Sequence, residues 1–378
     1  MPHAMNESRP ISPRASCIAT AVISAIAITL GACAHSRPAI ATELQRTGDE
    51  IVIAGRYFHT GAPVVLWTDA AGYDAYRVER RFVPIESADY TPDSKHTPNR
   101  YGLRRAGLDA DTLERVRGGG WDLATLQRTI DQFVIHYDVC GTSRQCFRVL
   151  HDIRGLSVHF MLDLDGTIYQ TLDVKERAWH ATTSNDRSVG IEIANIGAYP
   201  PSKAEVLESW YSPVSPGGSP SSSTSPSPTP DLPAICRVTL PASYGDGGLR
   251  TPNFVALTAR PGPIEGEVQG APYVMHDLTE AQYESLSRLT AALCAVLPRI
   301  ECDYPRDDQG YLVTHALDTD SLASYRGLIG HYHIQSNKID PGPAFDWDRV
   351  IDRARHLNPA LDRKRDPMHE SKPQPHSR

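Results

Sequence analysis

The sequence GHYHIQSNKIDPGPAFDW, at residues 330–347, constrains this chain more than any other stretch. It brings His331, Lys338 and Asp340 into one short segment. Histidine and aspartate are zinc ligands, and a lysine can balance a developing negative charge. The two prolines after Asp340 fix backbone φ, and the glycine between them permits a tight bend, so we expect a stiff loop. The alternative is a surface turn that leads into a helix beginning near Phe345.

Chain length and composition limit the possible classes of protein. A chain of 378 residues can bury one sizeable core and a second small unit. The net charge of −7 gives no sign of the basic patch that nucleic-acid binding requires. The 30 prolines indicate that part of the chain is linker. We therefore expect a globular monomer that does not bind nucleic acid.

The N-terminus has the features of an export signal. Two arginines precede an apolar, uncharged run at residues 17–32, which is shorter than the ~20 residues of a membrane-spanning helix. The run ends in Leu-Gly-Ala-Cys, which is typical of a lipoprotein cleavage site. We expect removal of residues 1–32 and lipid attachment to Cys33, with an ordinary secretory signal as the alternative. Because Ala34 follows, a Gram-negative host would place the protein on the periplasmic side of the outer membrane.

The central part of the chain predicts alternating helices and strands. Asp122 is a plausible N-cap for a helix, and FVIHYD, at residues 133–138, is a buried strand that ends near His136. Ligands bind at such strand ends in α/β folds. A histidine in this position is by default more often structural, but zinc needs a third protein ligand beside His331 and Asp340.

Two further expected strands contain polar candidates. LSVHFMLD, at residues 156–163, contains His159, and DG at its end closes a hairpin. His159 competes as a metal ligand, although we interpret it as a group behind the ligands or as part of the structure. SVGIEIAN, at residues 188–195, contains Glu192 between two small residues on one face, so we expect open space above this carboxylate. The alternative is an exposed glutamate on a half-buried strand.

The remaining signals divide the chain into segments. We expect a tether and N-terminal extension at 33–120, a catalytic domain at 121–358 and a disordered tail at 359–378. The catalytic domain is interrupted by an insertion at 198–277, whose part at 212–231 is nearly all Ser, Pro, Gly and Thr and cannot form a core.

Four elements are expected outside the strands that carry the candidate residues. They are a strand at 50–57, a long helix that opens with a capping box at Thr279 and Gln282, a strand at 312–315 and a helix at about 345–357.

Several motifs together resemble a known family. They are FVIHYD, VHF followed by DGTIYQ, RAWHA, GIE, and GH followed by K-x-DPGPAFDW, in this order. The chain resembles the zinc-dependent N-acetylmuramoyl-L-alanine amidases of the amidase-2 and peptidoglycan-recognition-protein superfamily, over about residues 123–196 and 278–357. The implied fold is α/β, with a mixed β-sheet flanked by helices on both faces. The implied reaction is hydrolysis of the bond between N-acetylmuramic acid and L-alanine in peptidoglycan or muropeptides.

The resemblance also implies roles for individual residues. His136, His331 and Asp340 would bind one zinc ion, with His333 as an alternative to His331 because the spacing to the lysine is short. Glu192 would be the catalytic base, and Lys338 would lie in the active site.

Substrate contacts would come from three further residues. Trp179 and His180 of RAWHA would lie at the rim of the substrate groove, and His159 joins them as a substrate-side candidate.

Two cysteines bracket the short sequence CGTSRQC. In an exported protein Cys140 and Cys146 predict a disulfide, and the family has a similarly spaced bridge. Cys236, Cys294 and Cys302 leave an odd number whose pairing stays open. A cysteine zinc site is the alternative, but no C-x-x-C pair is present.

Two other functions remain possible from the sequence. A peptidoglycan-binding module without activity is the first, although all three ligand candidates are present. Another zinc peptidase of cell-wall peptides is the second.

Overall fold

The computed structural model describes residues 44–89, 100–214 and 234–364. The expected export signal, Cys33, most of the Ser/Pro-rich stretch and most of the tail lie outside these ranges. The described residues from Arg46 onward belong to one compact unit. Within the described ranges, no helix combines the length and the apolar character needed to cross a bilayer.

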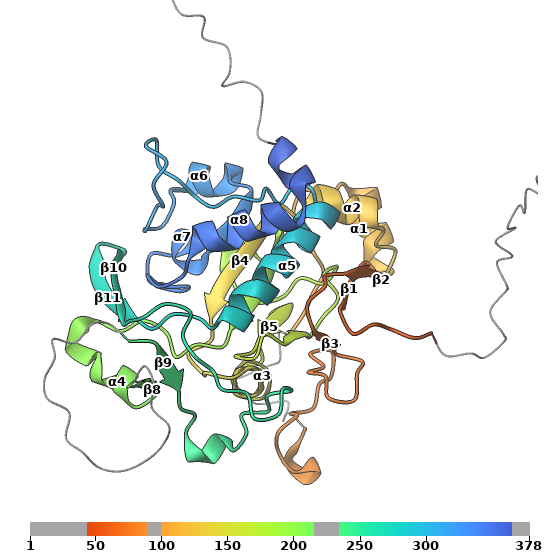
Figure 1. Ribbon diagram of the computed structural model, residues 1–378. Helices are drawn as coiled ribbons and strands as arrows, with labels where there is room; N and C mark the ends of the chain where they lie inside the picture. Colours follow the sequence, from red (N-terminus) through yellow and green to blue (C-terminus); the bar gives the residue numbers. More distant parts are fainter. Residues whose placement is uncertain (1–43, 90–99, 215–233, 365–378) are drawn as a thin grey trace, which may run out of the picture. The chain divides into compact units, whose positions relative to one another are not determined.

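A six-stranded sheet lies at the centre of this unit, in the order β12-β4-β7-β5-β6-β3 (Figure 1). Strands β12, β4, β7 and β5 are parallel, β6 is antiparallel to β5, and β3 is parallel to β6. The bounds are β3 Val64–Leu66, β4 Gln132–Tyr137, β5 Phe160–Leu162, β6 Ile168–Gln170, β7 Ser188–Ile193 and β12 Gly327–Gly330.

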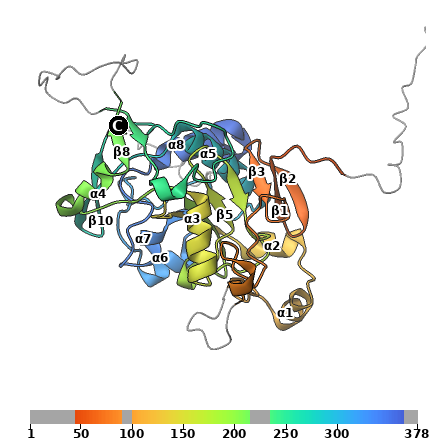
Figure 2. The same ribbon diagram turned by 90° about the horizontal axis from the view of Figure 1, so that it is seen from below.

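Helices cover both faces of this sheet, which confirms the expected fold class. The helices α5 and α8 lie side by side over one face (Figure 1), and α3 lies on the other side (Figure 2). Their bounds, with the adjoining turns of helix, are α2 Leu123–Thr129, α3 Ser143–Phe147, η2 Arg148–Ile153, η3 Thr182–Ser184, α5 Glu280–Val296, α6 Thr319–Ser324, α7 His331–Ile334, α8 Trp347–Leu357 and η6 Pro359–Lys364.

The alternation of side chains along β4 decides which face holds the site. Phe133 and Ile135 pack in the large core under α5 and α8, whereas Val134 packs in a separate cluster on the opposite face. Successive side chains of a strand point to opposite faces. His136 therefore shares the face of Val134, away from α5 and α8.

The N-terminal extension contributes an edge strand to the central sheet. The stretch expected as one strand at 50–57 is instead a hairpin, with a turn at Ala54 and Gly55 whose φ angles are 52° and 70°. Because both turn N–H groups donate to the Asp173 carboxylate, the chain reverses there. The bounds of the extension's elements are β1 Glu50–Ile53, β2 Arg56–His59, η1 Ile85–Ser87 and α1 Ala110–Arg117.

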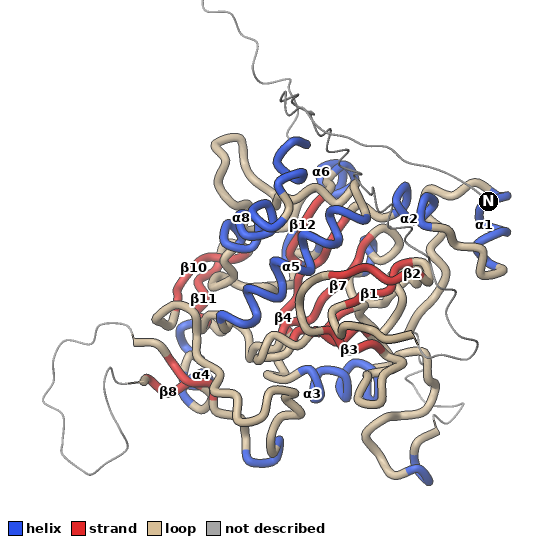
Figure 3. Tube along the Cα trace, turned by 45° about the vertical axis from the view of Figure 1, so that its right-hand side comes forward, coloured by secondary structure: helices blue, strands red, loops and turns tan. Residues whose placement is uncertain are grey.

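The described part of the insertion forms two hairpins that do not join the central sheet (Figure 3). The pair β8–β9 and the pair β10–β11 are each antiparallel. The bounds are η4 Pro201–Lys203, α4 Glu205–Glu208, β8 Tyr211–Pro213, β9 Cys236–Val238, η5 Ala242–Tyr244, β10 Ile264–Val268 and β11 Ala271–Met275.

The helix signals at Asp122 and at Thr279 are confirmed. The Asp122 carboxylate accepts from the backbone N–H of Thr125, and Thr279 and Gln282 form the reciprocal capping box of α5.

Two expectations near the C-terminus are wrong. No strand forms at 312–315, because the carbonyl of Val313 accepts from His333 and that of Thr314 accepts from the backbone of Gln269. The tail is not disordered from 359, since η6 carries Leu361 into the core.

Candidate metal centre and active site

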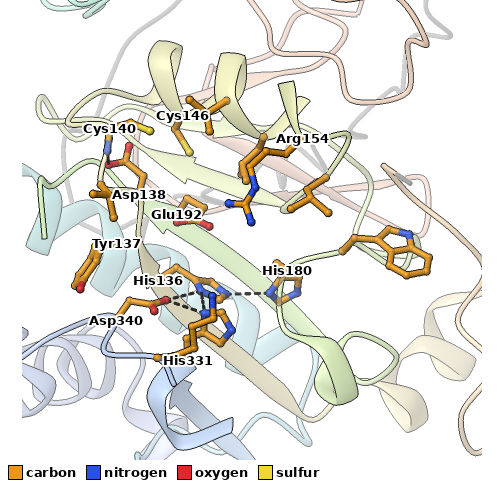
Figure 4. Close-up of a pocket in the computed structure, with 16 residues that line it drawn as sticks. His136, Tyr137, Asp138, Cys140, Cys146, Arg154, His180, Glu192, His331 and Asp340 are labelled. Carbon is orange, nitrogen blue, oxygen red and sulfur yellow. Dashed lines mark hydrogen bonds and ion pairs between the residues drawn. The ribbon is translucent and has the colours of Figure 1, made fainter. Parts of the chain in front are cut away.

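Two parts of the chain that are distant in sequence, the end of β4 with His136 and the segment with His331 and Asp340, meet at one edge of the sheet (Figure 4). Nδ1 of His136 lies 2.7 Å from Oδ2 of Asp340 and 3.0 Å from Nδ1 of His331. Nδ1 of His331 is 3.0 Å from the same Asp340 oxygen. These three atoms form a group that could hold a metal ion.

The topology explains why these residues meet. β12 pairs in parallel with β4, and Gly330 at the end of β12 lies opposite Ile135. Because parallel strands end at the same edge, His331 directly after β12 comes next to His136. The backbone N–H of Tyr332 then donates to the carbonyl of Asp340 at 3.1 Å, which brings the aspartate back to the histidines.

The outer nitrogen of each histidine is also occupied. Nε2 of His136 lies 3.0 Å from Nδ1 of His180, and Nε2 of His331 lies 2.8 Å from the side-chain oxygen of Gln335. A neutral imidazole carries one N–H. If each Nε2 donates outward, each Nδ1 carries a lone pair on the side of Asp340, and this is the tautomer that metal binding needs.

The donor set fits zinc. Two imidazole nitrogens and one carboxylate oxygen are the ligands of many catalytic zinc sites. In a tetrahedral site with bonds of roughly 2.0–2.1 Å, ligand atoms are about 3.3 Å apart. The separations of 2.7 to 3.0 Å between the atoms of His136, His331 and Asp340 are a few tenths of an ångström shorter.

Burial and charge keep this group ready for a cation. Burial, together with nearby His331, lowers the pKa of His136 to about 4, so its ring is neutral at pH 7. Burial alone would raise the pKa of Asp340, but the charge and hydrogen bonds of the two histidines outweigh it and hold that pKa below its usual range. Asp340 is therefore ionised beside the neutral ring of His136.

His333, the alternative ligand, lies elsewhere. Its Nδ1 accepts from the backbone N–H of Gly330 at 2.9 Å, and its Nε2 donates to the carbonyl of Val313 at 2.6 Å. Both nitrogens are used in holding the backbone, so the structure places His331, and not His333, with the other two candidates.

A cavity of about 180 Å³ opens beside the three candidate ligands. Glu192, Lys338 and Trp179 all line it, with the three ligands themselves. Glu192 is opposite His136 on the paired strands β7 and β4. Burial, together with the negative charges of Asp340 and Asp138, raises the pKa of Glu192 well above its usual value.

The space beside Gly190, which was expected to be open on the face that carries Glu192, is filled by another side chain. A side-chain carbon at Gly190 would come within 2.5 Å of the His180 ring, so this glycine leaves room for the histidine and not for substrate. His180 is half-buried beside His136, and burial with the neighbouring histidines lowers its pKa well below the usual value. His180 lines the cavity, and its Nδ1 also contacts Nε2 of His136.

His159 does not line the cavity. It is fully buried, its Nδ1 accepts from the backbone N–H of Gly190 at 3.1 Å, and its Nε2 lies 2.9 Å from the carbonyl of Glu176. The substrate-side interpretation of His159 is therefore wrong, because both ring nitrogens face the backbone inside the protein.

The expected bridge between Cys140 and Cys146 is absent from the structure, in which both residues are thiols. The two side chains are within hydrogen-bonding distance of each other. Burial raises the pKa of the Cys146 thiol, which disfavours the thiolate that disulfide exchange requires.

Sequence reasoning missed three residues of the site. Arg154 and Asp138 line the cavity, and Gln335 supports His331. Gln335 follows His331 by four residues, a spacing that places two side chains on one face of a helical turn and would have been a usable signal. No comparable signal marks Arg154.

A comparison with family models finds one match, in the central part of the chain. Residues 126–211 match the model described as N-acetylmuramoyl-L-alanine amidase. The match supports the amidase-2 superfamily and contains His136, His180 and Glu192. It ends before the insertion's second hairpin and before the segment that carries His331 and Asp340.

Several solved structures are similar to this chain at low sequence identity. A selenomethionine derivative of AmpD shares 16% identity with a TM-score of 0.29, over 70% of this chain and 96% of its own. AmiD from E. coli, in complex with anhydro-N-acetylmuramic acid-L-Ala-D-gamma-Glu-L-Lys, shares 16% identity with a TM-score of 0.32, over 60% of this chain and 57% of its own. AmpDh3 from Pseudomonas aeruginosa, in complex with anhydromuramic pentapeptide, shares 14% identity with a TM-score of 0.31, over 60% of each chain. No curated protein sequence matches the chain.

Proposed function

We propose that this protein is a zinc-dependent amidase that hydrolyses the bond between N-acetylmuramic acid and L-alanine in peptidoglycan or its muropeptide fragments. The observation that carries the proposal is the convergence of His136, His331 and Asp340 at a cavity that Glu192 and Lys338 also line. The family match over residues 126–211 supports the bond that is cleaved.

His136, His331 and Asp340 would hold the zinc ion through the atoms that now face one another. A zinc ion in such a site supplies Lewis-acid chemistry and lowers the pKa of water to ~7. His180 and Gln335 orient the two imidazole rings through their outer nitrogens.

Glu192 is the group that would move protons. It lies in a partly buried position beside the cavity, where its raised pKa suits a carboxyl that alternates between base and acid. Glu192 takes a proton from the attacking water and returns one to the leaving nitrogen of L-alanine, so that the amide bond breaks with no net change in the protein.

Lys338 is the second charged group at the cavity. Its ammonium carries a positive charge two residues before Asp340 and lines the same cavity. When water attacks the amide carbon, negative charge develops on the carbonyl oxygen, and Lys338 stabilises that charge. Trp179 lies at the cavity with the Arg177 guanidinium 4.3 Å from the centre of its ring, and it offers an aromatic surface to the sugar or peptide.

We test the reaction by mass spectrometry of purified peptidoglycan after digestion. The expected products are free stem peptides that begin with L-alanine, together with glycan that has lost them. Cleavage within the stem peptide would instead identify a peptidase. Binding to peptidoglycan without any cleavage would identify a binding module.

We also propose that the protein is exported and anchored by a lipid on Cys33, on the periplasmic side of the outer membrane in a Gram-negative host. The support is the order of charged, apolar and Leu-Gly-Ala-Cys segments. Cells fed radioactive palmitate should label the wild-type protein and not Cys33→Ser. An unlabelled wild type would indicate a simple secreted protein.

A further inference from the structure

The tip of the β10–β11 hairpin reaches the segment that carries two of the candidate metal ligands. Gln269 and Gly270 form this tip with φ angles of 55° and 73°. The backbone N–H of Gln269 donates to the carbonyl of Thr314 at 2.9 Å. The hairpin belongs to the insertion and lies outside the range that matches the family model.

The side-chain amide of Gln269 binds three backbone carbonyls of the ligand segment. Its Nε2 lies 2.8 Å from the oxygen of Tyr332, 3.1 Å from that of Gln335 and 3.3 Å from that of Lys338. Its Oε1 accepts from the backbone N–H of Ala316 at 3.1 Å. Three acceptors surround one end of the amide and a donor faces the other, so the chemistry of the neighbours determines which end is nitrogen.

Each of the three carbonyls belongs to a residue tied to the site. Tyr332 follows His331 and donates its N–H to Asp340, Gln335 accepts from Nε2 of His331, and Lys338 lines the cavity. The amide of Gln269 therefore joins the helical turn α7 to the loop that follows it.

The rest of the hairpin packs against the loop after Asp340. A side-chain carbon at Gly266 would come within 2.6 Å of Pro343, and one at Gly342 would come within 2.6 Å of the Met275 sulfur. Arg260 donates to the carbonyl of Ala344 at the end of this loop. Neither glycine has room for a side chain, so the hairpin and the loop pack closely against each other.

We propose that Gln269 is a positioning residue: it holds the segment of His331, Lys338 and Asp340 in the geometry that binds the metal, so that the insertion sets metal affinity. This inference rests on the metal-binding part of the proposed function. It assigns a role to the β10–β11 hairpin and needs no contact between Gln269 and substrate.

The test compares Gln269→Ala and Gln269→Glu with the control Gln309→Ala in the full chain. Glutamate keeps the shape and the acceptor for Ala316 but removes the N–H donors that face the carbonyls. Gln309 also precedes a glycine in a turn, is exposed, and is not bonded to the ligand segment. Zinc affinity is measured by competition with a chromogenic chelator, and the visible spectrum of the cobalt(II)-loaded proteins reports ligand geometry.

We expect both Gln269 variants to bind zinc about 10–100-fold more weakly and to show an altered cobalt spectrum, with Gln309→Ala unchanged. Thermal melting checks that each variant is folded. If Gln269→Ala does not fold, the zinc affinity and cobalt spectrum of Gln269→Glu test the proposal. Wild-type affinity and spectrum in the folded Gln269 variants would overturn the proposal, as would an equal loss in Gln309→Ala. Because no substrate is used, the proposal can stand even if the protein cleaves no peptidoglycan.

Discussion

His136 and the pair His331 and Asp340 belong to one metal group, but different parts of the molecule support them. His136 lies on β4, which is hydrogen-bonded on one side to β12 and on the other to β7. His331 lies on a four-residue turn of helix and Asp340 in the loop that follows. The first ligand is held by the sheet. The segment that carries the other two is bonded by the side-chain amide of Gln269, and His331 is also bonded by Gln335.

The difference shows two ways to fix a ligand. A central strand holds its side chains through regular backbone hydrogen bonds on both edges. A short turn and a loop have few such bonds and need partners from elsewhere in the chain. We therefore expect His136 to keep its place when the insertion is perturbed, whereas His331 and Asp340 move.

The largest effect should come from removing a ligand on either side of this comparison. His136→Ala and Asp340→Ala should each lose zinc, because three protein ligands are needed for a tight catalytic site. Elemental analysis should find metal only at background level, with turnover undetectable. A variant that kept zinc at the wild-type level would show that the lost residue is not a ligand.

Glu192 tests the sheet side of the cavity without touching the metal group. Glu192→Gln should keep zinc and the fold and lose about 10²–10⁴-fold in turnover, since general acid–base catalysis contributes that much. Steady-state kinetics on a muropeptide, with zinc content measured in parallel, checks this. Turnover within a few-fold of wild type would place the base elsewhere, and His180 would be the next residue to test.

A substitution of Lys338 tests the side of the cavity that is formed by the segment of His331 and Asp340. Lys338→Ala should keep zinc and lower kcat by about 10²–10³-fold, as removal of one group that stabilises the developing oxyanion does elsewhere. The KM should change less than kcat, because the charge develops only during the reaction. An effect confined to KM would assign Lys338 to substrate binding instead.

The smallest effect should come from the two side chains that orient the ligand rings. His180→Ala and Gln335→Ala should each weaken zinc binding by about 10–100-fold. Since β4 holds His136 by its backbone, we expect the smaller loss for His180→Ala. A larger loss for His180→Ala than for Gln335→Ala, measured by chelator competition, would contradict the comparison between sheet and loop.

Local signals in the sequence were sufficient for much of the framework. The β4 strand and the capping box of α5 follow from apolar patterning and capping residues, and the mixed sheet was implied by the resemblance to the amidase family. The candidate ligands were also named from the sequence, because zinc binding restricts the residue types and the stiff loop marks two of them. These features depend on residues near one another in the chain or on chemistry that few side chains can perform.

Long-range contacts decided the rest. β12, with the sequence GLIG, was not expected, and its pairing with β4 is what brings His331 to His136. Nothing near Gln269 in sequence reveals that its amide meets carbonyls 63 to 69 residues away. The ring of His180 fills the space at Gly190 only after loop and strand have packed together. The sequence by itself determined which residues can perform the chemistry. The tertiary structure decided which other side chains hold these residues in position, because such contacts form only where distant segments of the chain meet.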